Sequence, residues 1–191
     1  NRVLQKDDEI KIEDELSIPA GKPTIESLLK SDVALRNKDV KVIAGKIVAK
    51  GELSICSLYI SEGDGMATFV EHCLPFTEII DAQGISEDNY NNVDFHVIKS
   101  SVKPSADADG DLRVLDCDIR LGVTISSDEV VSAEVVADVY STSKKLNISS
   151  SNIEVDALTS NIDVSHTIKE NVMPAEGIPP ISHIYNVVAK P

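Results

Sequence analysis

The sequence of 191 residues predicts a mainly β protein, an antiparallel sandwich or barrel-like sheet pair with short helices near 24–30 and 180–188. Three observations predict this class. The apolar residues are mostly Val, Ile and Leu, which favour strands, and aromatic residues make up only 4%. Several segments alternate apolar and polar residues, as strands with one buried face do. Short Gly-containing sequences separate these segments.

The strand prediction is clearest for residues 115–125, where every second side chain is apolar. One face holds Leu115, Cys117, Ile119, Leu121, Val123 and Ile125. Segments 130–140 and 162–172 show the same alternation. Weaker alternation predicts further strands at 9–16, 33–36, 39–44, 46–60, 67–73, 93–103 and 153–158.

Turn sequences connect several of these strands. Ala44-Gly45, Gly63-Asp64-Gly65 and Asp109-Gly110 are each expected to close a hairpin. Gly51 interrupts a long apolar segment, which predicts a bulge or a bend there.

Each predicted helix begins beside proline and has one apolar face. Pro23 and Thr24 are suited to the start of the first, in which Ile25, Leu28 and Leu29 share a face. Pro179 and Pro180 start the second, whose apolar face holds Ile181, Ile184, Tyr185 and Val188. Both helices are expected to cover an end of the β core.

One phrase occurs twice in the chain. Residues 18–30 align with residues 173–186 after a single insertion. This predicts a β module at 1–142, followed at 143–191 by a polar linker and the opening of a second copy, in a chain that is part of a longer protein. Repeated modules serve assembly and binding more often than catalysis.

The charge balance restricts the partners. With 32 acidic and 18 basic residues the net charge is −14, which disfavours nucleic acid and anionic lipid. Cationic proteins, cell-wall polymers and divalent cations fit better. The sequence Asp7-Asp8-Glu9, with Glu13, Asp14 and Glu15, is interpreted as a solvated strand face or as a docking surface for a basic partner. No apolar run approaches 18 residues, so no membrane span is predicted.

No pattern in the sequence predicts a catalytic or cofactor site. Cys56, Cys73 and Cys117 are too widely spaced for a zinc site, and two interpretations stay open: buried thiols or an intermolecular crosslink. No sequence signature supports a nucleophilic pair of Cys73 or Cys117 with a histidine. The histidines also lack metal-ligand spacing; they are His72, His96, His166 and His183.

A weak calcium candidate lies at one predicted hairpin tip. Asp107, Asp109 and Asp111 place carboxylates at alternate positions. Gly110 occupies the fourth place rather than the sixth, so this is no EF-hand loop. A solvated hairpin tip explains the cluster equally well.

The ordered phrases of the first module resemble a known family. IPAGKPTIESLL, then DVKVIAGKIVAKGELSICSLYI at 39–60, then EHCLPFTEIID at 71–81 are similar to the SPOCS domain of spore-coat-associated proteins in endospore-forming Firmicutes. DLRVLDCDIRLGVTIS and VVADVYSTSKKLNI resemble its end and a linker before another copy. The second copy differs by Glu176-Gly177-Ile178 where the first has Gly21-Lys22.

This resemblance implies a non-enzymatic structural or adaptor module of the spore envelope, in the coat or exosporium, made in the mother-cell cytoplasm. Its implied partners are other envelope proteins or copies of itself, in a homo-oligomer or polymer such as a layer or filament. The alternative is a ligand-binding module for calcium or cell-wall polymer.

Overall fold

The computed structural model describes residues 1–132, 134, 136, 138–149, 151, 152, 154, 164–171, 173–185 and 187. The chain divides into two units, Asn1–Val131 with Ile184–Pro191, and Ser132–His183. All strands of the described residues lie in Asn1–Val131, and none of the described residues is helical.

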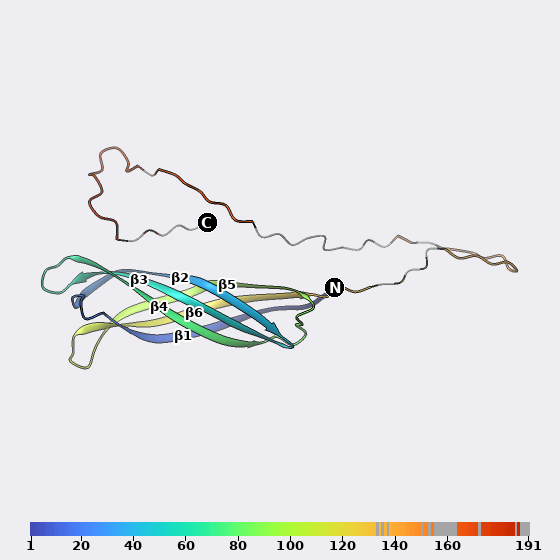
Figure 1. The fold of residues 1–191 in the computed structure, drawn as a ribbon, viewed down its shortest axis with the longest axis horizontal. Helices are drawn as coiled ribbons and strands as arrows, with labels where there is room; N and C mark the ends of the chain where they lie inside the picture. Colours follow the sequence, from blue (N-terminus) through green and yellow to red (C-terminus); the bar gives the residue numbers. More distant parts are fainter. Residues whose placement is uncertain are drawn as a thin grey trace. The chain divides into compact units, whose positions relative to one another are not determined.

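Six antiparallel strands form two three-stranded sheets (Figure 1). The first sheet, in the order β1-β6-β5, consists of β1 (Arg2–Ser17), β6 (Leu112–Asp128) and β5 (Tyr90–Ala106). The second, in the order β2-β3-β4, consists of β2 (Ile25–Ile43), β3 (Lys46–Ser61) and β4 (Ala67–Asp81). The predicted mainly β class is therefore confirmed.

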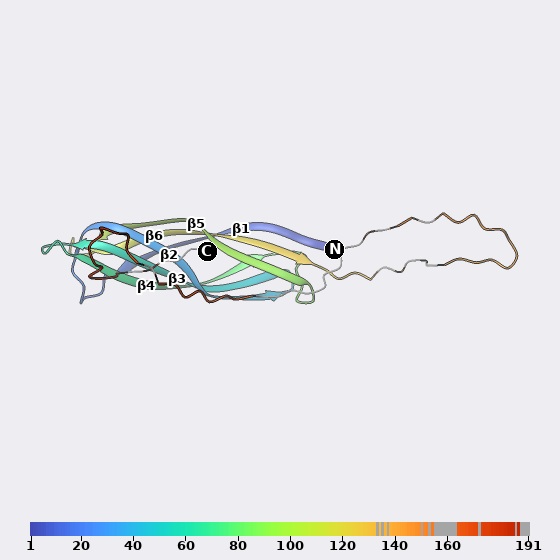
Figure 2. The same ribbon diagram turned by 90° about the horizontal axis from the view of Figure 1, so that it is seen from above.

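The core lies between the inner faces of the two sheets. Strand β6 confirms the predicted alternation, because Leu115, Ile119 and Ile125 are fully buried, with Cys117, Leu121 and Val123 beside them. Ile47, Leu53 and Ile55 of β3 form one cluster with Ile119 and Ile125, whereas Leu115 packs in a second cluster with Ile25 and Tyr59. In Figures 1 and 2 all six strands run lengthwise, so the core extends along the strands.

The chain enters and leaves the module at one end. The Asn1 amine donates to the Glu129 carbonyl (2.9 Å), and the Glu129 amide donates back to Asn1 (2.8 Å). The β2–β3 turn lies at this end too, where it bonds to the β4–β5 crossover through Gly45 and Ile85. The other end holds the crossover from β1 to β2, the β3–β4 turn and the β5–β6 turn. All three predicted hairpin turns are confirmed.

The predicted helix at 24–30 is wrong, because these residues open β2. Register shifts between Ile25 and Ser27 and between Leu28 and Lys30 each insert an extra residue into the strand. These two bulges space the core-facing Ile25 and Leu28 three residues apart, as on a helix, while Leu29 is 54% exposed. A bulged strand therefore has the same apolar spacing that a short helix would show.

Other boundaries differ from the prediction. Segments 33–36 and 39–44 belong to one strand, which bulges at Asn37 (φ 53°) opposite Gly51. The bend expected at Gly51 therefore lies on its partner strand. Strand β4 continues through Pro75 to Asp81, beyond the predicted end at residue 73.

The second unit contains no strand or helix among its described residues. Predicted strands 130–140 and 162–172 are not strands where described, and residues 133, 135, 137, 162, 163 and 172 lie outside the described residues. Of predicted strand 153–158 only residue 154 is described. In the predicted helix 180–188, residues 180–185 and 187 are not helical, and 186 and 188 lie outside the description. A turn at Glu176 and Gly177 is closed by the Ile178 amide on the Ala175 carbonyl (3.2 Å).

Candidate functional site

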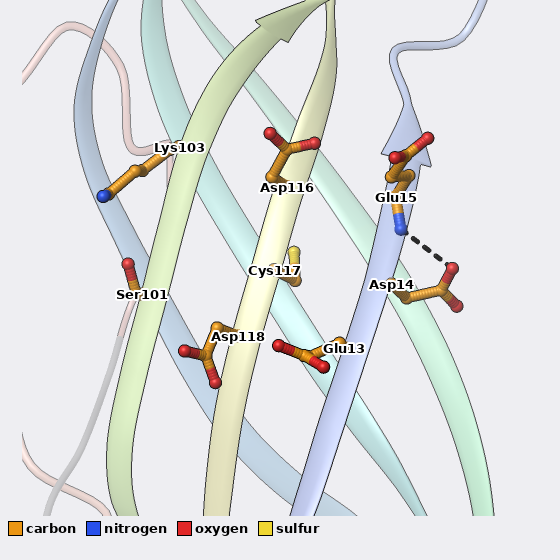
Figure 3. A pocket seen from close by; sticks show the side chains of 8 residues that line it. All are labelled: Glu13, Asp14, Glu15, Ser101, Lys103, Asp116, Cys117 and Asp118. Carbon is orange, nitrogen blue, oxygen red and sulfur yellow. Dashed lines mark hydrogen bonds between the residues drawn. The ribbon is translucent and has the colours of Figure 1, made fainter.

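An acidic hollow on the first sheet is the candidate site (Figure 3). Its volume is about 530 Å³, and residues from all three strands of that sheet line it. They are Glu13, Asp14 and Glu15 of β1, Asp116, Cys117 and Asp118 of β6, and Ser101 and Lys103 of β5.

The strand register brings four carboxylates together in this hollow. Glu13 is paired with Asp118, and Glu15 with Asp116. Like charges directly opposite one another destabilise a sheet. Lys103, opposite Asp116, is the cation that β5 brings to the hollow. The arrangement therefore favours cationic groups from outside the module.

Hydrogen bonds and ion pairs engage part of this charge. Ser105 Oγ donates to Asp116 Oδ1 (2.8 Å), and Lys11 Nζ lies 2.6 Å from Glu13 Oε1. Asp118 Oδ1 is buried and has no hydrogen-bond partner in the described part of the chain.

The same face is better neutralised toward the end where the chain enters. Arg120 Nη1 lies 3.3 Å from Glu9 Oε1, and Thr124 Oγ1 donates to Asp7 Oδ1 (3.0 Å). The carboxylates of Asp7 and Glu9 thus have partners on β6, whereas those near Glu15 have fewer partners within the sheet. The β1 acids are visible in the sequence, but their partners on β6 are not, because the pairing register joins residues about a hundred positions apart.

The thiols occupy surroundings that suppress reactivity. Burial raises the pKa of the Cys117 thiol to about 11, with Asp14 and Asp116 adding to the effect. Exposed Cys73 shares a hydrogen bond with Glu52, which raises the pKa of the Cys73 thiol. Cys56 is buried, with its Sγ 3.8 Å from Ser54 Oγ. Since thiolates are the nucleophilic form, neither raised pKa favours nucleophilic chemistry.

His72 and His96 make contacts within the β module. The His72 Nε2 atom is 3.0 Å from the Ser17 carbonyl oxygen and joins β4 to β1. The His96 ring lies against Gly122, its partner on β6. It is so close that a Cβ at that glycine would come 2.5 Å from ring atoms. His166 and His183 lie in the second unit.

The predicted calcium residues form the β5–β6 turn. Asp107 Oδ1 accepts the amides of Asp109 (3.0 Å) and Asp111 (3.1 Å). In the described ranges no three acidic, histidine or cysteine side chains gather as a metal site would require. Calcium binding at this turn stays a prediction.

The repeated phrase has a structural role that its sequence does not reveal. Residues 18–24 form the crossover from the first sheet to the second, and Arg113 binds its carbonyls. The Arg113 guanidinium donates to Ile18 (3.3 Å), Pro19 (3.0 Å) and Lys22 (3.1 Å). The Tyr59 hydroxyl donates to the Pro23 carbonyl (2.8 Å). Arg113 follows the phrase by about ninety residues, so no local signal connects them.

The described residues contain no helix that could span a membrane. Searches against curated proteins and against solved structures found no match. A family model described as SipL, SPOCS domain, matches residues 24–105, from the end of the β1–β2 crossover to nearly the end of β5. That match agrees with the resemblance seen in the sequence and indicates a sporulation-related protein. Residues 24–105 of this chain are therefore similar to the SPOCS domain family.

Proposed function

We propose that this chain is a non-enzymatic structural or adaptor module of the spore envelope, in the coat or exosporium, and that it works through protein–protein contacts. The SPOCS match at residues 24–105 is the observation on which this proposal rests. The β core fits such a role, because it presents two broad sheet faces on a rigid scaffold.

The acidic hollow is the surface that we assign to these contacts. Glu13, Glu15, Asp116 and Asp118 lie on one sheet face, where a partner with exposed Lys or Arg side chains would relieve their mutual repulsion. Charge complementarity of this kind steers association and selects partners more than it raises affinity. The interaction is therefore expected to weaken as salt concentration rises.

Localisation in sporulating cells tests the proposal. Antibodies against the purified chain, used with immunogold labelling on spore sections, should mark the coat or exosporium. A signal confined to vegetative cells, or absent from washed spores, would contradict an envelope role. Electron microscopy of the purified chain then separates two forms of the proposal: ordered layers or filaments indicate self-assembly, and monomers at high concentration indicate an adaptor.

A further inference from the structure

Strand β1 has the most regular free edge of the four strands that border the two sheets. Its pairing with β6 runs without a shift from Leu4 to Ser17. The other edge strands are interrupted: β2 by three register shifts, β4 by Pro75, and β5 by two shifts and Pro104. Bulges and prolines are common protections against the pairing of a further strand. The described residues of β1 show neither from Leu4 onward.

The backbone groups on that edge can be assigned from three contacts. The Ile18 amide donates to the Arg113 carbonyl of β6. The backbone N–H and C=O groups of even-numbered β1 residues therefore point toward β6, and those of odd-numbered residues point away from it. The amides of Glu9 and Glu15 accordingly donate to the side chains of Asp8 and Asp14, each at 2.8 Å. Figure 3 shows Asp14 turned to the side away from β6.

Between these two aspartates lie the edge groups of Lys11 and Glu13. Within residues 1–132, no hydrogen bond involves the amide of either residue, and β1 has a single ladder, with β6. Two side-chain contacts join β1 to β4, Lys6 Nζ to the Asp81 carbonyl (2.8 Å) and His72 to Ser17. Both lie outside the segment from Asp8 to Glu15.

The charges beside this edge determine which kind of strand can pair with it. The outward side chains of β1 alternate as Asp7, Glu9, Lys11, Glu13 and Glu15, beside Asp116 and Asp118 of β6. A second copy of β1 added to this edge would place acidic side chains against acidic ones, which is unfavourable. A strand with Lys or Arg at alternate positions would instead place its cations against these acids.

We propose that the free edge of β1 from Glu9 to Glu15 binds an extended, basic segment of a partner protein, which adds to the first sheet as a fourth strand. Backbone hydrogen bonds to Lys11 and Glu13 supply the affinity, and alternate cations facing the acidic hollow supply the specificity. The aspartate caps at Glu9 and Glu15 yield to carbonyls of the added strand. This inference rests on the proposed function and names the class of its partner.

A synthetic peptide of ten residues alternating Lys and Val is the probe, and a peptide alternating Glu and Val is its control. Calorimetry with the full chain should show binding of the Lys peptide alone. Hydrogen exchange should slow at the amides of Lys11 and Glu13 when that peptide is present. Failure to bind, or binding that leaves these amides unchanged, overturns the proposal.

Substitutions separate the edge from the charge. Glu13→Pro removes an edge donor without removing a bond to β6, and it should weaken binding about tenfold or more. Thr77→Pro on β4 is the matched control, and it should leave binding unchanged. Pro75 has no backbone N–H, so the amides of odd-numbered β4 residues, including Thr77, face the free edge of that strand. Glu13→Gln with Glu15→Gln should weaken binding and reduce its salt dependence while retaining the slowed exchange.

A second proline variant and a sedimentation experiment cover the remaining outcomes. If Glu13→Pro lowers the melting temperature enough to unfold the chain, Lys11→Pro makes the same test at the neighbouring edge amide. Peptide binding by a folded proline variant at wild-type strength contradicts the proposal. Sedimentation that shows wild-type dimers abolished by Glu13→Pro assigns the edge to a second copy and also contradicts it. Envelope localisation without peptide binding overturns this inference alone and leaves the proposed function standing.

Discussion

Phe76 lies directly across the β3–β4 ladder from Gly51, and its ring occupies the space where a side chain at Gly51 would lie. A Cβ at Gly51 would come 2.8 Å from two carbons of the Phe76 ring and 3.1 Å from Leu35 Cδ1. A side chain at Gly51, on the inner face of β3, would therefore displace the Phe76 ring, because that ring packs over the glycine backbone.

Gly51→Ala should therefore destabilise the module by about 1–3 kcal/mol through overpacking. Denaturant unfolding followed by circular dichroism measures the change. Phe76→Leu introduced into the same variant should recover part of the loss, because it removes the ring that the new methyl group meets. Gly21→Ala is the control, since nothing lies within 4 Å of a Cβ there. Equal effects of the two alanines would contradict this account.

Removal of the Arg113 guanidinium should release the crossover loop. Arg113→Ala removes the guanidinium donor from the carbonyls of Ile18 and Lys22 and leaves the Pro19 carbonyl with the Lys22 amide alone, with an expected loss of about 2–3 kcal/mol in unfolding free energy. Arg113→Lys should recover only part, because an ammonium group lacks the planar fork of donors. Limited proteolysis should show new cleavage near Lys22 in the alanine variant.

Arg36→Ala is the matched control for Arg113. Its guanidinium makes an exposed contact with Glu71 at 3.4 Å, so less than about 1 kcal/mol should be lost. A comparable loss from both variants would mean that Arg113 acts as an ordinary surface charge.

Acid should destabilise the module through carboxylates bound in the folded state. The Ser61 hydroxyl, with the Met66 amide, lowers the pKa of Asp64 below its ordinary 3.8. A hydrogen bond from Lys6 lowers the pKa of Asp8, and one from Arg2 lowers the pKa of Asp128. Their stabilisation is complete above the unfolded pKa and is lost as the pH falls through the lower, folded pKa.

Unfolding free energy measured from about pH 6 to pH 2 should therefore fall below about pH 4. Asp64→Asn should reduce that slope, since an amide does not titrate, whereas Glu62→Gln in the same turn serves as the control. An unchanged slope in the Asn variant would show that Asp64 contributes nothing to acid sensitivity.

The thiols should react in an order set by burial. Cys73 is exposed, whereas Cys56 and Cys117 are 9% and 4% exposed. Iodoacetamide at neutral pH should modify Cys73 alone, and slowly, because the bond with Glu52 raises the pKa of that thiol. Glu52→Gln should speed the reaction. Mass spectrometry identifies the modified cysteines, and denatured protein, as the control, should show all three modified. Labelling of native Cys117 at the rate of Cys73 would contradict the expected order.

Local pattern predicted the strands of this module well and the short helix badly. Alternation located β6 and the turn sequences located three hairpins, because both signals arise between near neighbours in the chain. At Ile25, Leu28 and Leu29 the same kind of signal was misleading, since two bulges change the spacing of core residues and depend on the partner strand. The acids of β1 were visible in the sequence, but the hollow requires β6 and β5 beside them.

The sequence by itself determined the β class, the acidic surface and the family phrases, because residue type, charge and periodicity act locally. Only the tertiary structure decided that β1 pairs with β6, that Arg113 binds the repeated phrase, and that no second strand among the described residues pairs with β1. These depend on long-range register, in which each strand selects a partner by burying its apolar face against a distant segment. Apolar residues at every second position show which face of a strand is buried, but they do not show which other strand that face packs against.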